Sequence, residues 1–370
     1  MSKETWIRYA DKLGPELLEY TARHDEDGTF VAESYHALKA DGFFAALVPQ
    51  ELGGMGANLE EICEFIRTLA HYCPSTALAY SMHSHLVATT LWKHLHGNPA
   101  DALLRRIAEQ KLVLVSTGAG DWLESNGTLT RVDGGYRYTA YKPFASGSPM
   151  GDVMITSGRY EDPEKGPMVL HFPLPFSTEG VSRGDDWNTH GMRGTGSSTV
   201  TIENAFIPDA SISVARPRGP WHPAFDVICT AALPIIMSAY VGVAEKAAEL
   251  ALASARKRRD DPDVAYIAGQ LLNELFQVRA IWRAHVDNAN NLDFVPDSDR
   301  TSLSLQAKST VAEACIRTVD KAMELGGGSA FFRRNRIESL MRDVRAAPYH
   351  PLQAIRQQRV CGRIALGLEP

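Results

Sequence analysis

Two hydrophobic periods divide the chain into helical and sheet-forming parts. Near the N-terminus, apolar and aromatic residues recur at steps of three and four, the period of an amphipathic helix: Trp6, Tyr9, Leu13, Leu17 and Tyr20. Further helices are predicted at 35–40, 60–73 and 75–96. Because the last of these is rich in Ala, Leu and Met and poor in charge, we expect it to be buried on nearly all sides. Residues 1–112 are therefore predicted to form a helical domain.

The middle of the chain changes to a period of two. Val200 and Ile202 alternate with polar residues, which is typical of a half-buried strand. An Asp133-Gly134 turn separates two alternating runs and is a strong signal for a β-hairpin. Short strands at regular intervals predict a small antiparallel β-barrel over residues 113–215.

The C-terminal part returns to the helical period. Long amphipathic stretches with short links predict an antiparallel four-helix bundle over residues 220–370, with helices at 225–259, 263–291, 302–324 and 355–366. The predicted fold class is therefore α+β with several domains. The length of 370 residues agrees with this, since it exceeds the usual size of a single hydrophobic core.

Composition and charge argue against several classes of protein. The net charge of −6 and the lack of a long basic tract disfavour a nucleic-acid-binding surface. The longest apolar stretch, 231–243, is too short to span a bilayer, and the N-terminus lacks a secretory signal. Five widely spaced cysteines without a Cys-x-x-Cys motif predict reduced thiols. We expect a cytoplasmic protein without a metal, a membrane or a nucleic-acid partner.

The segment 185–208 concentrates open backbone and hydrogen-bond donors. Its glycines let the backbone approach a flat or anionic group without a Cβ in the way: Gly191, Gly194 and Gly196. Donors stand beside them at Arg193, Thr195, Ser197 and Ser198. Taken alone, such a cluster before a strand is also typical of a plain loop.

The sequence of this segment resembles the middle domain of the acyl-CoA dehydrogenase superfamily. Trp187 is followed by Gly-Met-Arg-Gly-Thr-Gly-Ser and, after the strand, by Ile-Pro. Other matches are the Val-Pro and Gly-Gly-x-Gly element at 48–56, the segment 134–152, and Leu-Gly-Gly-Gly with Arg-Asp within 325–350. The resemblance spans residues 6–367 and implies helical, β and bundle domains, a bound flavin, FAD or FMN, and a dimer of dimers.

The resemblance also implies which residues would contact the flavin. In Lys-Pro-Phe-Ala-Ser-Gly at 142–147, Phe144 would cover the ring and Ser146 would bond its N5/O4 edge. The strand end at Ser116 and Thr117, with the Ala119-Gly120 pair, would face the flavin pyrimidine, although the Glu-Pro of the family motif is lacking. The 185–208 segment would lie beside the flavin through Trp187, Arg193, Thr195 and Ser197.

The chain departs from the dehydrogenases where their catalytic glutamate stands. Counted from Arg342, that position falls on Pro351, and no carboxylate lies between Asp343 and Glu369. A base that takes the α-proton is therefore missing where the geometry requires it. In its place stands His350, within an Arg-Asp-Val-Arg-x-x-x-Tyr-His-Pro string. This string resembles the two-component flavin-dependent monooxygenases of the dibenzothiophene monooxygenase type, for which we expect a proton donor with a pKa near neutrality.

Two histidines on the predicted helix 75–96 are expected to face different directions. His83 and His85 are two residues apart, about 200° of rotation, so they cannot ligate one metal ion. The ordinary interpretation is a pair of hydrogen-bonded core histidines. The resemblance implies instead that His85 points at the flavin ring edge, as the matching histidine of the monooxygenases does.

Three functions are compatible with the sequence. The favoured hypothesis is a flavin-dependent monooxygenase or hydroxylase that acts on a small apolar or aromatic substrate, with His350, His85 and Ser146 around a flavin that a separate reductase supplies reduced. The second is an FAD-dependent acyl-CoA dehydrogenase whose base is relocated to Glu245 or Glu249. The third is a non-catalytic partner subunit of the same fold.

Overall fold

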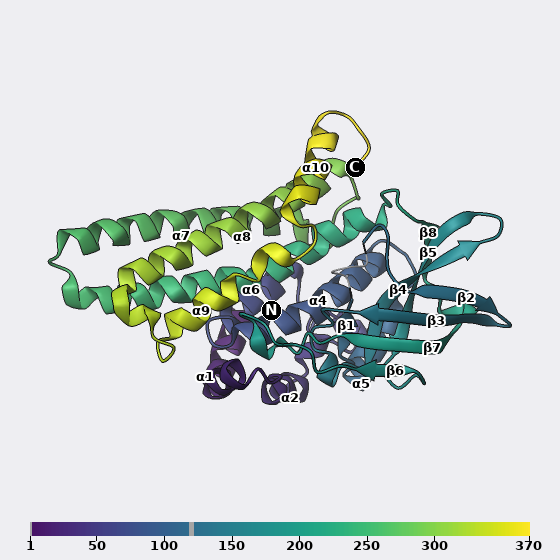
Figure 1. Ribbon diagram of the computed structural model, residues 1–370, viewed down its shortest axis with the longest axis horizontal. Helices are drawn as coiled ribbons and strands as arrows, with labels where there is room; N and C mark the ends of the chain where they lie inside the picture. Colours follow the sequence, from purple (N-terminus) through teal and green to yellow (C-terminus); the bar gives the residue numbers. More distant parts are fainter. Residues whose placement is uncertain (1, 118–121) are drawn as a thin grey trace.

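The computed structural model describes residues 2–117 and 122–370. It has the predicted order of N-terminal helices, middle sheet domain and C-terminal helical bundle. In Figure 1 the long helices α6 (Ala224–Ala255), α7 (Pro262–Asn288) and α8 (Ser298–Gly326) extend to one end of the molecule, and the strands lie at the other. The N-terminal helices lie between and below them, so all three parts meet near the middle of the molecule (Figure 1).

The N-terminal domain contains the predicted helices. They are α1 (Lys3–Asp27), α2 (Ala32–Ala40), α3 (Leu59–Leu69), α4 (Pro74–Leu95) and α5 (Asp101–Gln110). Helix α3 begins with a capping box, in which the Asn58 side chain accepts the backbone N–H of Glu61 and the Glu61 side chain accepts the N–H of Asn58. Helix α4 is buried over most of its length, as its composition predicts.

The middle domain is one sheet of mixed direction. Its strands are β1 (Leu114–Ser116), β2 (Thr128–Val132), β3 (Gly135–Lys142), β4 (Val153–Asp162), β5 (Gly166–Pro175), β6 (Val181–Arg183), β7 (Val200–Pro208) and β8 (Val214–Pro217). The order is β6-β7-β3-β2-β4-β5-β8, with β1 beside β4. The predicted hairpin is present, since β2 and β3 pair antiparallel around Asp133-Gly134.

The prediction that all strands pair antiparallel was wrong for two pairs of strands. Both β1 and β2 run parallel to β4. Parallel pairing requires a long crossover, and the β2–β3 hairpin with the loop after it supplies one. The parallel register sets Leu114 beside Val153 and Ser116 beside Ile155, so the three residues of β1 pair with the first three residues of β4.

The bundle consists of three long helices and two short ones. The long α6, α7 and α8 pack on one another, while α9 (Arg336–Val344) and α10 (Ala354–Ala365) pack against α8. The predicted fourth helix is α10; α9 was not predicted. Helix α6 is long and apolar enough to cross a membrane, but 94% of its most apolar window is buried inside the protein, which is typical of a core helix.

Candidate active site

The loop between β6 and β7 is bound to the end of α1 through Arg193. The Arg193 guanidinium donates to the backbone carbonyls of Asp25, at 2.5 Å, and Glu26, at 3.2 Å, both at the end of α1. It also donates to Thr189 O at 3.0 Å within the loop. These bonds differ from the predicted flavin contact, because the N–H groups expected to face a flavin are directed at carbonyls. Arg193 is a cross-link between α1 and the loop.

The loop glycines allow close approach of neighbouring protein segments. A Cβ on Gly191 would lie 2.1 Å from the Arg342 carbonyl oxygen, and one on Gly194 would lie 2.9 Å from a Val31 methyl group. At Gly196, whose φ is +55°, a Cβ would lie 2.6 Å from the Phe30 ring. Packing against α9 and against the segment before α2 therefore already requires glycine here, and the approach of a flavin to this loop stays a prediction.

A chain of hydroxyl groups runs through the interior of this loop. Ser146 Oγ lies 2.7 Å from Ser197 Oγ, and Ser197 Oγ lies 2.7 Å from Thr195 Oγ1. Thr195 then donates to Met192 O at 2.9 Å. Thr195 and Ser197 are buried and Ser146 is half-buried. The hydroxyl at the Ser146 end is therefore the one that another molecule can reach.

Two aromatic rings stand beside this hydroxyl chain. Phe144 and Trp187 pack edge to face, with ring centroids 5.9 Å apart, and Trp187 Nε1 donates to Met192 O at 3.1 Å. Phe144 is 52% exposed and has a φ of +61°, a conformation that bulky side chains rarely adopt. Strain of this kind collects at functional sites, and an exposed flat ring suits a planar ligand such as an isoalloxazine.

The strand end predicted to face the flavin pyrimidine is partly described. Thr117 is buried and donates to Thr156 Oγ1 on β4 at 3.1 Å. Ser116 is half-buried at the end of β1. The Ala119-Gly120 pair, predicted to act with them, lies outside the described residues.

His83 and His85 diverge as the helical rotation predicts. His83 is fully satisfied, since Nε2 bonds Phe44 O at 2.7 Å and Nδ1 accepts the Leu114 N–H at 3.0 Å. It is a structural link between α4 and β1. His85 is also buried, but its Nδ1 has no hydrogen-bond partner. Because buried polar atoms are rarely left unpaired, this orphaned atom marks His85 as the member of the pair available to a ligand.

His350 lies close enough to His85 for their charges to interact. It follows a short turn after α9, and its Nε2 is 2.6 Å from the hydroxyl oxygen of Tyr240 on α6. Burial, then the neighbouring Lys308 and His85, lowers the pKa of His350 to about 3. The expectation of a pKa near neutrality was therefore wrong, because the surroundings of the ring are apolar and cationic. At neutral pH His350 is an uncharged hydrogen-bonding group.

The Arg342-Asp343 pair joins this histidine to the loop. Asp343 is buried and accepts the Met192 N–H at 2.6 Å. Arg342 binds the Asp25 carboxylate with two bonds of 2.8 and 2.5 Å. The same α9 that precedes His350 is thus fixed to Met192, whose carbonyl oxygen holds Trp187 and Thr195. Helix α9 therefore links the turn that carries His350 to the loop that holds the hydroxyl chain.

The residue that the sequence did not reveal is Tyr240. It lies within an apolar stretch of α6 and is fully buried. A buried tyrosine hydroxyl needs a partner, so its presence in such a helix was the available signal. Nothing in the local pattern could identify His350 as that partner, which comes from 110 residues further along the chain.

Sequence comparison agrees with the folded arrangement. A model of the acyl-CoA dehydrogenase N-terminal domain matches residues 8–111, and one of the acyl-CoA dehydrogenase C-terminal domain matches residues 234–349. Together these matches cover more than half of the chain. The chain belongs to the acyl-CoA dehydrogenase family.

Named relatives within this family carry out oxidations. Amino sugar nitrososynthase RubN8 of Streptomyces rubradiris is 26% identical over 362 residues, covering 94% of this chain and 85% of the relative. Dibenzothiophene monooxygenase of Mycolicibacterium goodii is 30% identical over 212 residues, covering 55% and 50%. These relatives confirm the predicted class, a flavin-dependent oxidoreductase with monooxygenase-type chemistry, and the resemblance to dibenzothiophene monooxygenase.

A solved structure shows the same fold with a flavin. KijD3 in complex with FMN and a dTDP-linked 3-amino sugar superposes with a TM-score of 0.90 at 24% identity, covering 100% of this chain and 94% of that chain. The predicted fold class is confirmed by this likeness, and a flavin is confirmed as the cofactor of related structures.

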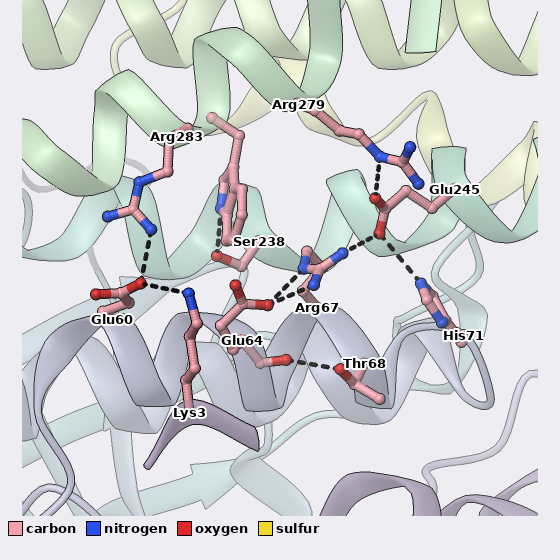
Figure 2. Close-up of polar contacts among 11 residues, drawn as sticks. Lys3, Glu60, Glu64, Arg67, Thr68, His71, Ser238, Glu245, Arg279 and Arg283 are labelled. Carbon is pink, nitrogen blue, oxygen red and sulfur yellow. Dashed lines mark hydrogen bonds and ion pairs between the residues drawn. The ribbon is translucent and has the colours of Figure 1, made fainter. Parts of the chain in front are cut away.

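Within the acyl-CoA dehydrogenase family, the relocated-base alternative requires a free carboxylate on α6. Glu245 is 5% exposed and is bonded by Arg67 at 2.5 Å, Arg279 at 2.7 Å and His71 at 3.3 Å (Figure 2). Burial raises the pKa of Glu245, but these partners outweigh it and lower the value to about 2. Glu249 is exposed and pairs with Lys246. Neither carboxylate is arranged as a base.

Metal chemistry finds no support in this part of the chain either. Within residues 2–117 and 122–370, no three His, Cys, Asp or Glu side chains converge in a way that could hold a metal ion. The donor set of the site consists of hydroxyl groups, imidazoles and aromatic rings, which suits the edges and faces of an isoalloxazine ring.

Replacing Ser146 by alanine is expected to weaken flavin binding about 5- to 10-fold, the value of one or two neutral hydrogen bonds. Ser146 is the accessible end of the hydroxyl chain, so its loss would remove the expected bond to the flavin edge and one of the two hydroxyl partners of Ser197. Fluorescence titration with FMN and with FAD measures the affinity. Ser182→Ala, at an exposed hydroxyl on β6, serves as the control. Equal affinities for Ser146→Ala and the parent protein would show that Ser146 does not contact the flavin.

Proposed function

We propose that this protein is a flavin-dependent monooxygenase that uses reduced flavin and O₂ to oxygenate a small apolar or aromatic molecule. The observation that carries the proposal is His350: an uncharged imidazole bonded to Tyr240 stands directly before Pro351, the position that the resemblance assigns to the carboxylate base of a dehydrogenase. A neutral imidazole can donate and accept hydrogen bonds, but with a pKa lowered to about 3 it is a weak base for removing the α-proton of a thioester.

The residues have distinct proposed roles around the flavin. Phe144 and Trp187 cover the ring, while Ser146, held by Ser197, bonds its polar edge. Ser116 and Thr117 bond the pyrimidine end. Reduced flavin, when bound, supplies the two electrons that activate O₂. His85 and His350 would offer hydrogen bonds to the substrate and to the oxygen that reacts beside the flavin.

The supply of reduced flavin and the surroundings of the protein belong to the same proposal. A separate flavin reductase provides the reduced cofactor, FMN or FAD. The described cysteines are free and buried, which fits a reducing cytoplasm. Large apolar side chains on the outer face of α7 fit a homo-oligomer built through the bundle, a dimer of dimers; they are Tyr266, Leu272 and Phe276.

Isotope labelling tests the proposal directly. The protein is mixed anaerobically with reduced FMN, and separately with reduced FAD, then exposed to ¹⁸O₂ with a panel of aromatic thioethers, amines and amino sugar nucleotides. Incorporation of one ¹⁸O atom into a product is the expected result. A parallel assay offers acyl-CoA thioesters with an artificial electron acceptor. Acceptor reduction in that assay, without ¹⁸O incorporation in the first, would establish a dehydrogenase and overturn the proposal.

A further inference from the structure

Tyr240 contacts His350 in a way that controls which ring nitrogen carries the proton. The tyrosine is fully buried at the middle of α6, its hydroxyl oxygen is 2.6 Å from His350 Nε2, and the two ring centroids are 5.4 Å apart. We infer that Tyr240 is a positioning residue that fixes His350 as the Nδ1–H tautomer, so that Nδ1–H is the donor offered to the bound molecule. This inference rests on the proposed function for its catalytic consequence, but not for the tautomer itself.

The direction of the hydrogen bond follows from the burial of the tyrosine. Burial raises the pKa of Tyr240 well above its usual value, and the nearby Asp343 and Cys315 act in the same direction. The phenol therefore keeps its proton, and because its hydroxyl has no other hydrogen-bond partner among the described residues, it donates that proton to Nε2. A neutral imidazole that accepts at Nε2 must carry its own proton at Nδ1.

The groups around His350 keep the ring uncharged. Tyr240 faces it from α6, Lys308 from α8 and His85 from α4, and no described carboxylate pairs with His350. Lys308 is 1% exposed, and its ammonium donates to Leu352 O at 3.1 Å and to Pro348 O at 3.4 Å. These two carbonyls lie on either side of His350 in the chain. Lys308 therefore fixes the backbone that carries His350 while Tyr240 fixes its ring.

The other ring nitrogen is left for a ligand. Among the described residues, none forms a hydrogen bond with His350 Nδ1, and the half-buried side chain is not sealed from solvent. The neighbouring His85 Nδ1 is also without a partner. A donor fixed at His350 and an unpaired nitrogen at His85 together offer two hydrogen-bonding positions to one bound molecule.

The test reads the tautomer by ¹⁵N nuclear magnetic resonance of ¹⁵N-histidine-labelled full-length protein. His350→Gln identifies the His350 signals by their loss. We expect the parent protein to show a protonated Nδ1 and an unprotonated Nε2 at neutral pH, and Tyr240→Phe to show a mixture of both tautomers. A parent protein with its proton at Nε2, or a Tyr240→Phe protein with an unchanged tautomer, would overturn the inference.

A second buried tyrosine provides the control. Tyr80 is also about fully buried, and its hydroxyl donates to Phe43 O at 2.6 Å, a bond of the same length to a backbone group. Tyr80→Phe should cost similar stability by thermal unfolding and leave the His350 tautomer unchanged. A tautomer change of the same size in Tyr80→Phe would assign the effect to lost packing and contradict the inference.

Turnover then separates this inference from the proposed function. In Tyr240→Phe we expect about 10-fold less oxygenated product per reduced flavin, with KM for the substrate nearly unchanged. If the tautomer shifts as expected but the parent protein oxygenates nothing, the proposed function fails while the tautomer assignment stands. If the parent protein oxygenates its substrate and Tyr240→Phe does so equally well, the positioning role is wrong.

Discussion

Replacing His350 by alanine is expected to lower the yield of oxygenated product per reduced flavin by about 100-fold, because positioned acid-base and hydrogen-bonding groups typically contribute about 10²- to 10⁴-fold. Flavin binding should change little, since the hydroxyl chain and the aromatic rings lie on other elements. Reduced flavin that is not used productively should reduce O₂ to hydrogen peroxide instead. Product yield by mass spectrometry and peroxide by a peroxidase assay measure the two branches.

Two further variants separate chemistry from folding. His350→Asn keeps an N–H donor near the position of Nδ1, so it should recover part of the yield that His350→Ala loses. His96→Ala removes an exposed imidazole that bonds Trp92 O, and it should leave the yield unchanged. An unchanged product yield in His350→Ala would show that His350 has no part in the oxygen chemistry.

The protonation state of His350 adds a pH dependence to this prediction. Its pKa is lowered to about 3 by burial first, and then by Lys308 and His85. The ring is therefore neutral throughout the range from about pH 5 to pH 9. We therefore expect that the pH profile of product yield has no inflection near pH 6.5 that depends on His350. The profiles of the parent protein and of His350→Asn should have the same shape in this range. Such an inflection would mean that the imidazolium takes part.

Local pattern was sufficient to predict the elements of the fold. The three- and four-residue period at Trp6 to Tyr20 predicted α1, and Asp133-Gly134 predicted the β2–β3 hairpin. These signals depend on neighbours within a few residues, so the sequence alone contains them. Helix α9 was missed because it is short and lies between the glycines after α8 and Pro348.

Candidate site residues could be predicted only where a motif within one chain segment identifies them. Ser146, Ser197 and Thr195 were predicted from their motifs, and the structure joins them in a hydroxyl chain. What each loop residue does could not be predicted in this way. The guanidinium of Arg193 donates to a backbone carbonyl at the end of α1. Gly191 is needed because a Cβ at this position would clash with the carbonyl oxygen of Arg342.

The electrostatic state of the site was the least predictable property. A histidine in a loop before a proline suggests an ordinary pKa, but Lys308 and Tyr240 come from helices 42 and 110 residues away in the chain. Their proximity exists only after the bundle has packed. Burial and a neighbouring cation then shift the pKa of His350 in the same direction.

Replacing Glu245 by alanine is expected to cost about 3–5 kcal/mol in the free energy of unfolding, the usual effect of removing one partner from a buried ion pair. Arg67, on α3, would lose a charged partner at 2.5 Å, while its bonds to Glu64 on the same helix would remain. Glu245 also joins α7 through Arg279, so its removal weakens the contact among three helices (Figure 2). Urea unfolding measures the loss. Glu249→Ala, one turn further on α6 and exposed, should change stability by less than about 0.5 kcal/mol.

The same carboxylate should give the unfolding free energy an acid dependence of known sign. Burial raises the pKa of Glu245, but His71, Arg67 and Arg279 lower it to about 2 from the ordinary 4.5. A group with a lowered folded-state pKa stabilises the protein fully above pH 4.5, and that contribution is lost as the pH falls towards 2. Glu245→Gln should therefore be less stable than the parent at pH 7 and should show a shallower loss between pH 4.5 and 2. Equal slopes would mean that Glu245 is not held by these cations.

Glu245→Gln also distinguishes the two chemistries considered for this fold. If Glu245 is a structural ion-pair residue, its replacement should lower the stability of the protein. The folded fraction should then keep its oxygenase yield at temperatures well below the unfolding temperature. As a relocated base, its replacement would abolish acyl-CoA oxidation in a protein that is still folded. The bonds to Arg67, His71 and Arg279 favour the first outcome, because a carboxylate with a pKa of about 2 that is bonded to two arginines and a histidine is a poor acceptor for an α-proton. Loss of acyl-CoA oxidation in Glu245→Gln, with unchanged stability, would mean that the Glu245 carboxylate is free in the working enzyme. That result would contradict the monooxygenase assignment.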